Sequence, residues 1–304
     1  MDSLTHGLIA AALAYLLGLP GLIPFAVAGS MIVDVDATLT RFSDRNPERY
    51  LFTHGGIAHS LAGAAVMGAL AWAVVVPLAG TGLFPPAISG AALPAVFVAA
   101  LAGAYLHIGL DTLACPGLPL FAPRSDRKYT AGLLPGPSVL LMAVSVLFLL
   151  GLGLGVVGWP GMILPYVAII AAFLAVRLAA FVLVRAELHG AGRPIPTISP
   201  LRWLVIGETP DAWTVGEYRL GKGPTEPAVY PKYRDTTAAA VAPYLDLPEV
   251  RRVRYHSYIT TAAAEGGALV IADPLRTSRA IFYPPYYTEV RIPLADGAGD
   301  GAGR

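Results

Sequence analysis

Long runs without charged residues dominate the first two thirds of the chain. Residues 7–33, 60–106 and 129–176 contain no Asp, Glu, Lys or Arg. A spanning helix needs about 20 apolar residues, so each of the two longer runs can hold two helices joined by a short turn. The pattern therefore predicts about four spanning helices, over residues 58–77, 91–111, 138–158 and 163–184.

The first apolar run, residues 7–33, is interrupted by the helix breakers of "LLGLPGLIP". One straight helix from His6 to Asp34 would be about 42 Å long and would place these residues on opposite sides of a hydrocarbon layer about 30 Å thick. The Gly and Pro residues instead favour two short helices, near 4–17 and 22–33. Such a broken hairpin enters the membrane and returns, which brings His6 back to the side of Asp34.

The last part of the chain has a different character, since 26 of the 41 charged residues follow Arg185. Alternating apolar and polar positions predict strands at "RWLVIGE", "AWTVGEYRL", "VRYHSYITT", "ALVIAD" and "TEVRIPL". The third of these places His256 in a strand. The segment "TTAAAVAPYL" predicts one helix, and the low-complexity end "DGAGDGAGR" predicts disorder.

These elements predict an α-helical multi-pass membrane domain followed by a small α+β, β-rich domain. The membrane domain, with its broken hairpin and spanning helices, is expected over residues 1–187 and contains the candidate site. The soluble β-rich domain is expected over 188–295, and a disordered tail over 296–304.

Composition supports the membrane class. The chain is 55% hydrophobic and 13% charged, whereas a soluble globule has about 25% charged residues. The net charge of +1 favours neither a nucleic-acid partner nor an acidic substrate. Cys115 is the only cysteine, which excludes an intrachain disulfide and a thiolate zinc knuckle.

Lys and Arg residues of the membrane part lie in segments 34–56 and 112–136 and around the end of the last span. By the positive-inside rule, these segments and the C-terminal domain face the cytoplasm. The sequence thus predicts a multi-pass protein of the cell (inner) membrane.

Ligand-type side chains collect at the cytoplasmic ends of the predicted helices. His107 and Asp111 are four residues apart, so a helix places them on one face. The full set at this membrane face is His6, Asp34, Asp36, His54, His59, His107 and Asp111. Imidazole and carboxylate are the ligands of catalytic zinc and of mixed two-metal sites, where a metal-activated water can attack an ester or phosphoester.

Plainer explanations exist for each part of this set. His6 could be a polar residue at a helix end, and "VDVD" a helix stop with two solvated aspartates. His54 and His59 could be a loop residue and an N-terminal helix position, and "HIGLD" could make a satisfied interhelical hydrogen bond. Ionisable groups at spans are costly and tend to be functional, so the whole set favours a shared metal site. A metal-ion or proton transporter is the alternative, but it needs a ligand at the midplane, where residues 61–106 and 129–176 offer only Tyr. A non-catalytic scaffold with a structural metal is a further alternative.

Five motifs occur in a fixed order: "MDSLTH", "DVD", "HGGIAHS", "HIGLD" and "GLPLFAPR". Together they resemble the YdjM-like inner-membrane family of metal-dependent hydrolases, the LexA-regulated type, in its long form with a C-terminal soluble extension. The resemblance implies metal ligands at the seven residues given above. It implies one to three divalent ions, zinc first, with manganese or magnesium as alternatives.

The family is also distantly similar to zinc-dependent phospholipase C, which implies phosphoester hydrolysis of a membrane lipid or lipid-linked substrate. Asp34 is our first candidate for the general base and Asp111 the second. Gly55 and Ala58 depart from the family motif "HRGxTHS", which has Arg and Thr there. If that Arg binds an anionic substrate, another cation must replace it. Candidates in the following loop are Arg124, Arg127 and Lys128.

Overall fold

The computed structural model describes residues 1–79, 81, 92–156, 158–281 and 286–294, so the predicted disordered tail lies outside the described residues. The chain divides into two compact units. The helical unit comprises Met1–Asp44, Leu51–Leu183 and Pro196–Pro200. The β-rich unit comprises Arg45–Tyr50, Val184–Ile195 and Leu201–Arg304.

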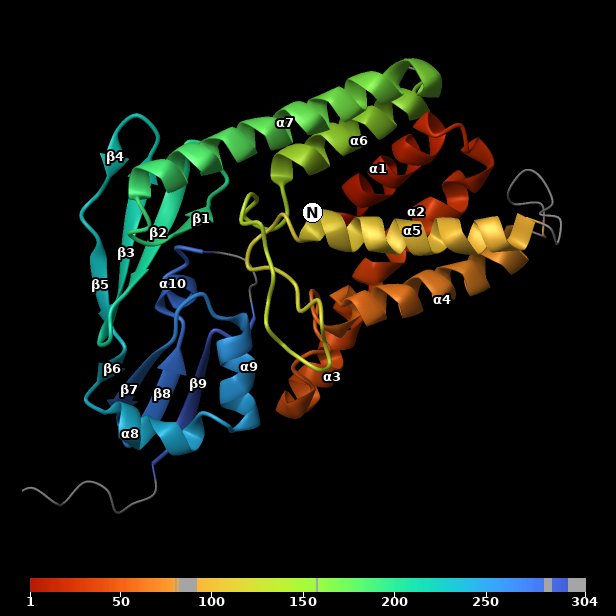
Figure 1. Cartoon of the computed structure of the whole chain (residues 1–304). Coiled ribbons are helices and arrows are strands. Elements are labelled where there is room, and N and C mark those ends of the chain that lie inside the picture. The colour runs from red at the N-terminus through yellow and green to blue at the C-terminus, as the bar shows by residue number, and fades with distance from the viewer. Residues whose placement is uncertain (80, 82–91, 157, 282–285, 295–304) are drawn as a thin grey trace, which may run out of the picture. The chain divides into compact units, whose positions relative to one another are not determined.

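The helical unit contains the apolar helices predicted from the sequence (Figure 1). Its elements are α1 (Ser3–Leu16), α2 (Ile23–Ile32), the 3-10 helix η2 (Val33–Leu39), α3 (Thr40–Arg45), the 3-10 helix η4 (Ile57–His59), α4 (Leu61–Ala79), α5 (Leu93–Asp111), α6 (Val139–Gly153) and α7 (Trp159–Leu188). Within the described part of the chain, four segments are long and apolar enough to cross a membrane. They are Pro20–Arg45, Leu61–Ala79, Leu93–Asp111 and Trp159–Leu188.

The broken hairpin predicted at the start of the chain is confirmed. Helix α1 ends before Gly18, a 3-10 turn follows at Pro20–Leu22, and α2 then packs against α1. As a result the Ser3 hydroxyl donates a hydrogen bond to Asp34. Residues separated by 31 positions thus meet on one side, as the helix breakers predict.

Helices α2 and α5 cross at very close range. A Cβ atom on Gly29 would lie 1.9 Å from the carbonyl oxygen of Ala100, and one on Gly103 would lie 2.0 Å from that of Ala26. Small residues allow this backbone approach in membrane helices. The crossing fixes the end of α2, where η2 begins, against the last turns of α5.

Helix α6 is shorter than the predicted span of residues 138–158. It begins after Ser138, whose side chain accepts a hydrogen bond from the amide of Leu141, and ends at Gly153. Gly155 has a φ of +66°, and the amide of Val156 bonds back to the carbonyl of Gly151, so the glycines of "GLGLG" stop the helix early. Its 15 residues cover about 22 Å, less than the hydrocarbon thickness.

The β-rich unit contains two sheets. The first has the order β1 (Arg193–Pro196), β2 (Arg202–Glu208), β3 (Ala212–Arg219), β4 (Gly223–Pro224), with β5 (Ala228–Pro231) also paired to β3. The second has the order β6 (Tyr233–Arg234), β7 (Thr261–Glu265), β8 (Ala268–Ala272), β9 (Glu289–Pro293). Trp203 and Tyr218 face each other across β2 and β3, and both are buried. The predicted membrane domain followed by a β-rich domain is confirmed.

The segment "VRYHSYITT" departs from the predicted strand. Its first residues belong to helix α9 (Pro248–His256), and β7 begins only at Thr261. Proline at the first helical position favours a helix start, and Val250 and Val253 are buried one helical turn apart. His256, predicted in a strand, is therefore the last residue of α9.

The helix predicted at "TTAAAVAPYL" is present only in part. The segment forms α8 (Ala238–Val241), capped by the Thr237 side chain, and then a 3-10 turn at Ala242–Tyr244. A last short helix of this unit is α10 (Pro274–Thr277).

Candidate metal centre

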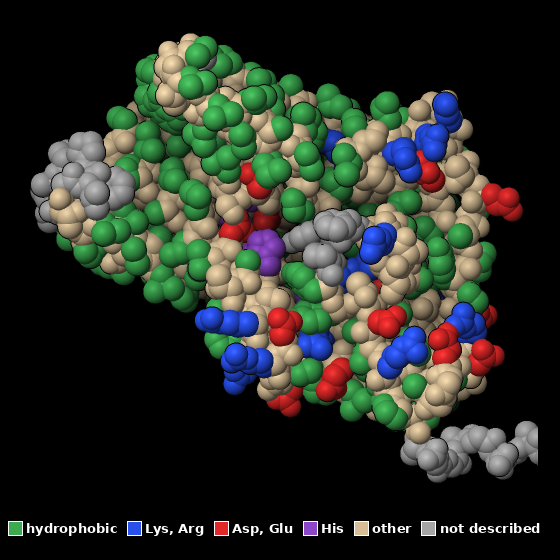
Figure 2. All heavy atoms as spheres, turned by 180° about the vertical axis from the view of Figure 1, so that it is seen from behind, with side chains coloured by type: hydrophobic (Ala, Val, Ile, Leu, Met, Phe, Trp, Pro, Cys, Tyr) green, Lys and Arg blue, Asp and Glu red, His purple; other side chains and the backbone are tan. Residues whose placement is uncertain are grey.

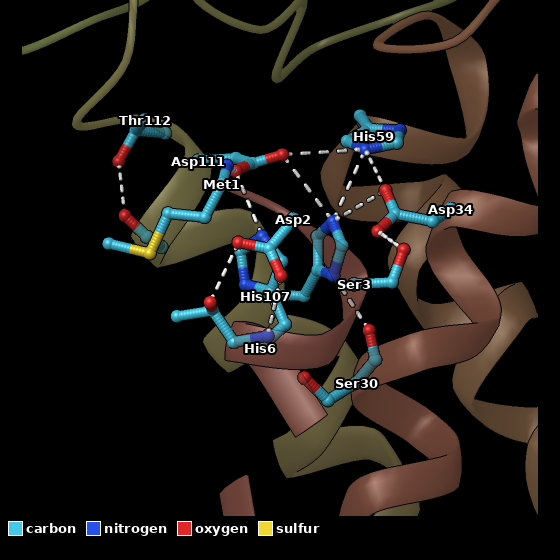
Figure 3. A network of polar contacts seen from close by, with 12 residues as sticks. Met1, Asp2, Ser3, His6, Ser30, Asp34, His59, His107, Asp111 and Thr112 are labelled. Carbon is cyan, nitrogen blue, oxygen red and sulfur yellow. Dashed lines mark hydrogen bonds and ion pairs between the residues drawn. The ribbon is translucent and has the colours of Figure 1, made fainter. Parts of the chain in front are cut away.

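Seven ligand-type residues of the sequence lie in one region of the helical unit. Figure 3 shows five of them, His6, Asp34, His59, His107 and Asp111. His107 and Asp111 occupy the last two turns of α5, and His59 ends η4 just before α4. Asp34 and Asp36 lie in η2, which continues directly from α2. His6 comes from α1 and His54 from the loop before η4.

Four of these residues direct one atom each at a common point: Asp34, His59, His107 and Asp111. The Nε2 atoms of His59 and His107 are 3.3 Å apart. Asp34 Oδ1 lies 3.5 and 3.3 Å from these two nitrogens, and Asp111 Oδ2 lies 3.6 and 3.4 Å from them. Ligands at 2.0–2.1 Å from a tetrahedral zinc ion are separated by about 3.3–3.4 Å. These five separations therefore match those of a tetrahedral ligand set, and all four atoms lie within 4.8 Å of one another.

Hydrogen bonds to the other ring nitrogens fix how the two imidazoles are protonated. His107 Nδ1 lies 2.6 Å from the carbonyl oxygen of Ser30, and His59 Nδ1 lies 2.8 Å from Asp36 Oδ2. Each partner is an acceptor, so each Nδ1 carries the hydrogen and each Nε2 presents a lone pair. Two lone pairs that face each other at 3.3 Å repel unless a cation or a proton lies between them.

Asp34 Oδ1 provides an independent indication of a cation. This oxygen is buried and has no hydrogen-bond partner among the described residues. A buried carboxylate oxygen without a partner is strongly unfavourable, and coordination to a metal satisfies it. The donor set, two imidazoles and two carboxylates, is one that binds zinc, so the residues present fit a divalent metal.

Both carboxylates are held by their outer oxygens. Asp34 Oδ2 accepts the hydrogen bond from Ser3, and Asp111 Oδ1 lies 3.0 Å from His6 Nε2 and also contacts the amino group of Met1. The inner oxygens are thereby directed at the common point. Such supporting bonds orient metal ligands and tune their affinity.

The other three residues, His6, Asp36 and His54, are not part of this converging group. The His6 ring stacks on His107, with ring centroids 3.8 Å apart. Asp36 joins two histidines, because its Oδ1 lies 2.9 Å from His54 Nδ1 while its Oδ2 holds His59. Asp36, His54 and His59 form a second group that could hold an ion, but hydrogen bonds at these distances already account for its geometry.

His54 is the most exposed histidine of this region. Its side chain is 25% exposed, whereas those of His6, His59 and His107 are fully buried. Figure 2 shows a histidine at the surface beside acidic side chains. The centre is thus buried on its inner side and reaches the surface near His54.

Burial and charge act on His59 in opposite directions. Burial lowers the pKa of this imidazole, but its contacts with Asp34 and Asp36 outweigh burial and raise the pKa to about 10. Without a cation, the carboxylates would stabilise a protonated imidazole. A divalent ion at the same place substitutes for that proton and leaves His59 neutral as a ligand.

Sequence reasoning missed two supporting residues, Ser3 and Ser30. Ser3 acts through its hydroxyl and Ser30 through its backbone carbonyl, and neither is a ligand-type residue. Ser3 lies in the motif "MDSLTH", three positions before His6, and this is the signal that the sequence offers. The contribution of Ser30 has no sequence signal, since any residue has a carbonyl.

With this geometry, the comparison with known families is informative. The model of the YdjM inner membrane protein family matches residues 1–184. The chain belongs to this family. The matched region contains all seven ligand-type residues. The match confirms the resemblance to the YdjM family and the prediction of a membrane protein. No curated protein and no solved structure matches the chain.

Proposed function

We propose that this YdjM family member is a membrane-embedded metal-dependent hydrolase that cleaves an ester or phosphoester of a lipid or lipid-linked compound. The observation that supports this most is the convergence of Asp34, His59, His107 and Asp111, whose ligand-type atoms all lie within 4.8 Å of one another. A divalent ion, zinc first, supplies a Lewis acid that makes water acidic enough to attack near neutral pH.

The chain's own residues supply orientation and proton transfer. His59 and His107 remain neutral donors because Asp36 and the Ser30 carbonyl hold their Nδ1 hydrogens. Asp34 and Asp111 are the candidates for accepting the proton of the attacking water, in that order. Ser3 and His6 hold the outer oxygens of Asp34 and Asp111 in place for this role.

The depth of the centre supports a hydrolase over a transporter. His59 precedes α4, and His107 and Asp111 lie in the last two turns of α5, so these three side chains lie at one end of the spans formed by α4 and α5. Asp34 meets them there from η2. The adjoining stretches, residues 61–106 and 129–176, contain no charged residue or histidine. A centre level with lipid headgroups is accessible to an amphiphilic substrate, and the positive-inside rule assigns this face and the C-terminal unit to the cytoplasm.

A non-catalytic scaffold is the second candidate, and one observation favours it. Four protein donors are enough for a closed tetrahedral zinc site, whereas catalytic sites keep an open position. The hydrolase therefore requires one carboxylate oxygen to turn away, and the scaffold does not.

Metal analysis of the purified full chain, combined with an ester and phosphoester panel, tests the proposal. We expect wild type to retain metal and hydrolyse a member of the panel. His59→Ala and Asp111→Ala each remove a ligand and should lose both the metal and the turnover. His189→Ala, at an exposed histidine, is the matched control and should keep both. Metal retained with no turnover on any substrate would establish the scaffold instead.

A further inference from the structure

A loop between α5 and α6 forms an ordered hairpin beside the metal centre (Figure 1). Leu118 and Tyr129 exchange two backbone hydrogen bonds, of 3.0 and 2.9 Å. These bonds close residues 118–129 into a loop, which we call the headgroup loop. The amide of Leu61 bonds to the carbonyl of Leu120 at 3.0 Å. This ties the loop to the first residue of α4, two positions after His59.

The same loop also contacts the segment that contains His54. A Cβ atom on Gly55 would lie 3.9 Å from Leu118 Cδ2, so the base of the loop packs on the residue next to His54. His54 is the histidine through which the centre reaches the surface. The base of the headgroup loop therefore lies beside the segment that contains His54.

Exposed apolar and aromatic side chains surround the tie between the loop and α4. Leu61 and Tyr105 are each 41% exposed and Phe121 is 52% exposed. The Tyr105 hydroxyl donates to the carbonyl of Leu61 at 3.3 Å, at the end of the spans formed by α4 and α5. Aromatic side chains favour the boundary between hydrocarbon and headgroups, so this rim marks the level of the membrane interface.

The same loop also carries exposed cations. Arg124 and Arg127 are exposed, and the Arg127 guanidinium lies 5.5 Å from the ring centre of Tyr129, which in turn meets Phe121 edge to face at 5.4 Å. The loop contains three basic residues and one acidic residue. Arginine binds phosphate oxygens in a planar, two-pronged geometry that lysine does not reproduce.

We propose that the headgroup loop binds the phosphate of an anionic phospholipid, with Arg124 and Arg127 on the headgroup and Phe121, Leu61 and Tyr105 on the upper acyl chains. The bound lipid presents its ester or phosphoester to the metal centre. Only this last statement rests on the proposed function. The binding site itself rests on the loop, its cations and its apolar rim.

Native mass spectrometry of the full chain, titrated with phosphatidylglycerol or phosphatidylcholine in a nonionic detergent, tests the site. We expect the first phosphatidylglycerol to bind several-fold more tightly than the first phosphatidylcholine. Each arginine near an anionic headgroup contributes about a fivefold effect, so Arg124→Gln/Arg127→Gln should remove most of the preference. Equal affinity for the two lipids in wild type, or an unchanged preference in this variant, would refute the proposal.

Two control variants separate the site from general charge. Arg124→Lys/Arg127→Lys keeps the charge but not the two-pronged contact, so it should keep a reduced preference for phosphatidylglycerol. A preference as large as in wild type would count against the two-pronged arginine contact, and its complete loss would count against an electrostatic site. Arg202→Gln/Arg219→Gln removes the same charge from the β-rich unit, where both arginines pair with Glu217, and should have no effect. An equal loss in this control would show that net charge alone sets the preference.

Two further measurements identify the source of the phosphate and separate this proposal from the hydrolase. Excess water-soluble glycerol phosphate should not displace the lipid, because it lacks chains for the apolar rim, and full displacement would show a free-phosphate site instead. His59→Ala should keep the lipid preference while losing turnover. If wild type shows the preference and hydrolyses nothing, the lipid site stands and the hydrolase fails.

Discussion

Two groups of buried polar side chains, one in each unit, are satisfied in opposite ways. In the β-rich unit, the buried Asp273 accepts hydrogen bonds from the backbone amides of Tyr258 and Leu275, at 2.6 and 3.0 Å. The neighbouring Arg276 donates to the carbonyl of His256 at 3.0 Å. In the helical unit, the four converging side chains direct acceptor atoms at one another instead.

The difference distinguishes polar burial that serves the fold from polar burial that serves a ligand. A buried group that is closed by backbone hydrogen bonds needs nothing further. Lone pairs that converge on one point carry a desolvation cost that only a cation or a proton removes. Loss of metal should therefore affect the four converging side chains and leave the buried group at Asp273 unchanged.

Removal of metal should have the largest effect, and only in the helical unit. A metal ion that binds only the folded state, at a free concentration 100 times its Kd, stabilises that state by about 2.7 kcal/mol. Hydrogen exchange of α4 and α5 should therefore accelerate when a chelator is added and slow again with zinc, while β7 and β8 stay unchanged. Equal acceleration in both units, or none in either, would contradict the comparison.

Asp36→Asn should weaken metal binding without removing it. Asp36 holds His59 through its Nδ1 hydrogen, and loss of such a supporting bond weakens metal affinity by about 10- to 100-fold. Competition with a chromophoric zinc chelator measures the change. Asp273→Asn is the matched control, since it also removes a buried carboxylate, and it should leave zinc affinity unchanged. If the two variants behave alike, the distinction between the units is wrong.

Asp273 should make the β-rich unit less stable as pH rises. Burial raises the pKa of this carboxyl, while amide hydrogen bonds from Tyr258 and Leu275 lower it, and the net direction is upward. The folded state then binds the proton more strongly than the unfolded state, so stability falls as pH increases from about 4. Hydrogen exchange of β7 and β8 across this range should show the decline in wild type.

The variant Asp273→Asn removes that titration and sharpens the result. It should flatten the pH dependence of the opening free energy of β7 and β8, obtained from exchange rates that are corrected for the intrinsic effect of pH on amide exchange. It should also cost about 1–3 kcal/mol, because one of the two amides loses its acceptor. A wild-type pH dependence that persists in the variant would show that another group causes it.

The sequence predicts the fold of the helical unit better than it predicts the detailed chemistry of the metal centre. Charge-free runs locate α4, α5 and α7, and the breakers after α1 return the chain, because hydrocarbon thickness sets a strict length requirement. In the β-rich unit, "VRYHSYITT" misleads because β-branched and aromatic residues favour a strand locally. Proline at position 248 and the contacts of Val250 and Val253 with the core decide for a helix.

Residue types alone identify the seven candidates for the centre but not the four whose atoms converge. That selection depends on which ring nitrogen or carboxylate oxygen is already engaged. The Ser30 carbonyl, 77 positions from His107, and Ser3, 31 positions from Asp34, decide it. Such contacts follow from the crossing of α2 with α5 and of α1 with α2, which residue type does not encode.

The smallest expected effect concerns a polar chain in the helical unit that serves the fold. Ser145 Oγ in α6 lies 2.9 Å from Thr5 Oγ1 in α1 and 2.9 Å from the Tyr166 hydroxyl in α7. All three are buried and hydrogen-bonded, like Asp273 and unlike the converging four. Ser145→Ala should therefore cost about 0.6 kcal/mol, the average for hydrogen bonds between membrane helices, and leave zinc affinity within about twofold.

Ser145→Thr, which keeps the hydroxyl, is the matched variant for this chain and should restore the hydrogen bonds if the added methyl group fits. Thermal unfolding in a fixed detergent, with and without zinc, measures both variants. A tenfold weaker zinc affinity in Ser145→Ala, restored in Ser145→Thr, would mean that the chain positions α1 and its supports Ser3 and His6 for the metal. A hydroxyl of the helical unit that makes only ordinary hydrogen bonds would then control metal binding as well as the fold.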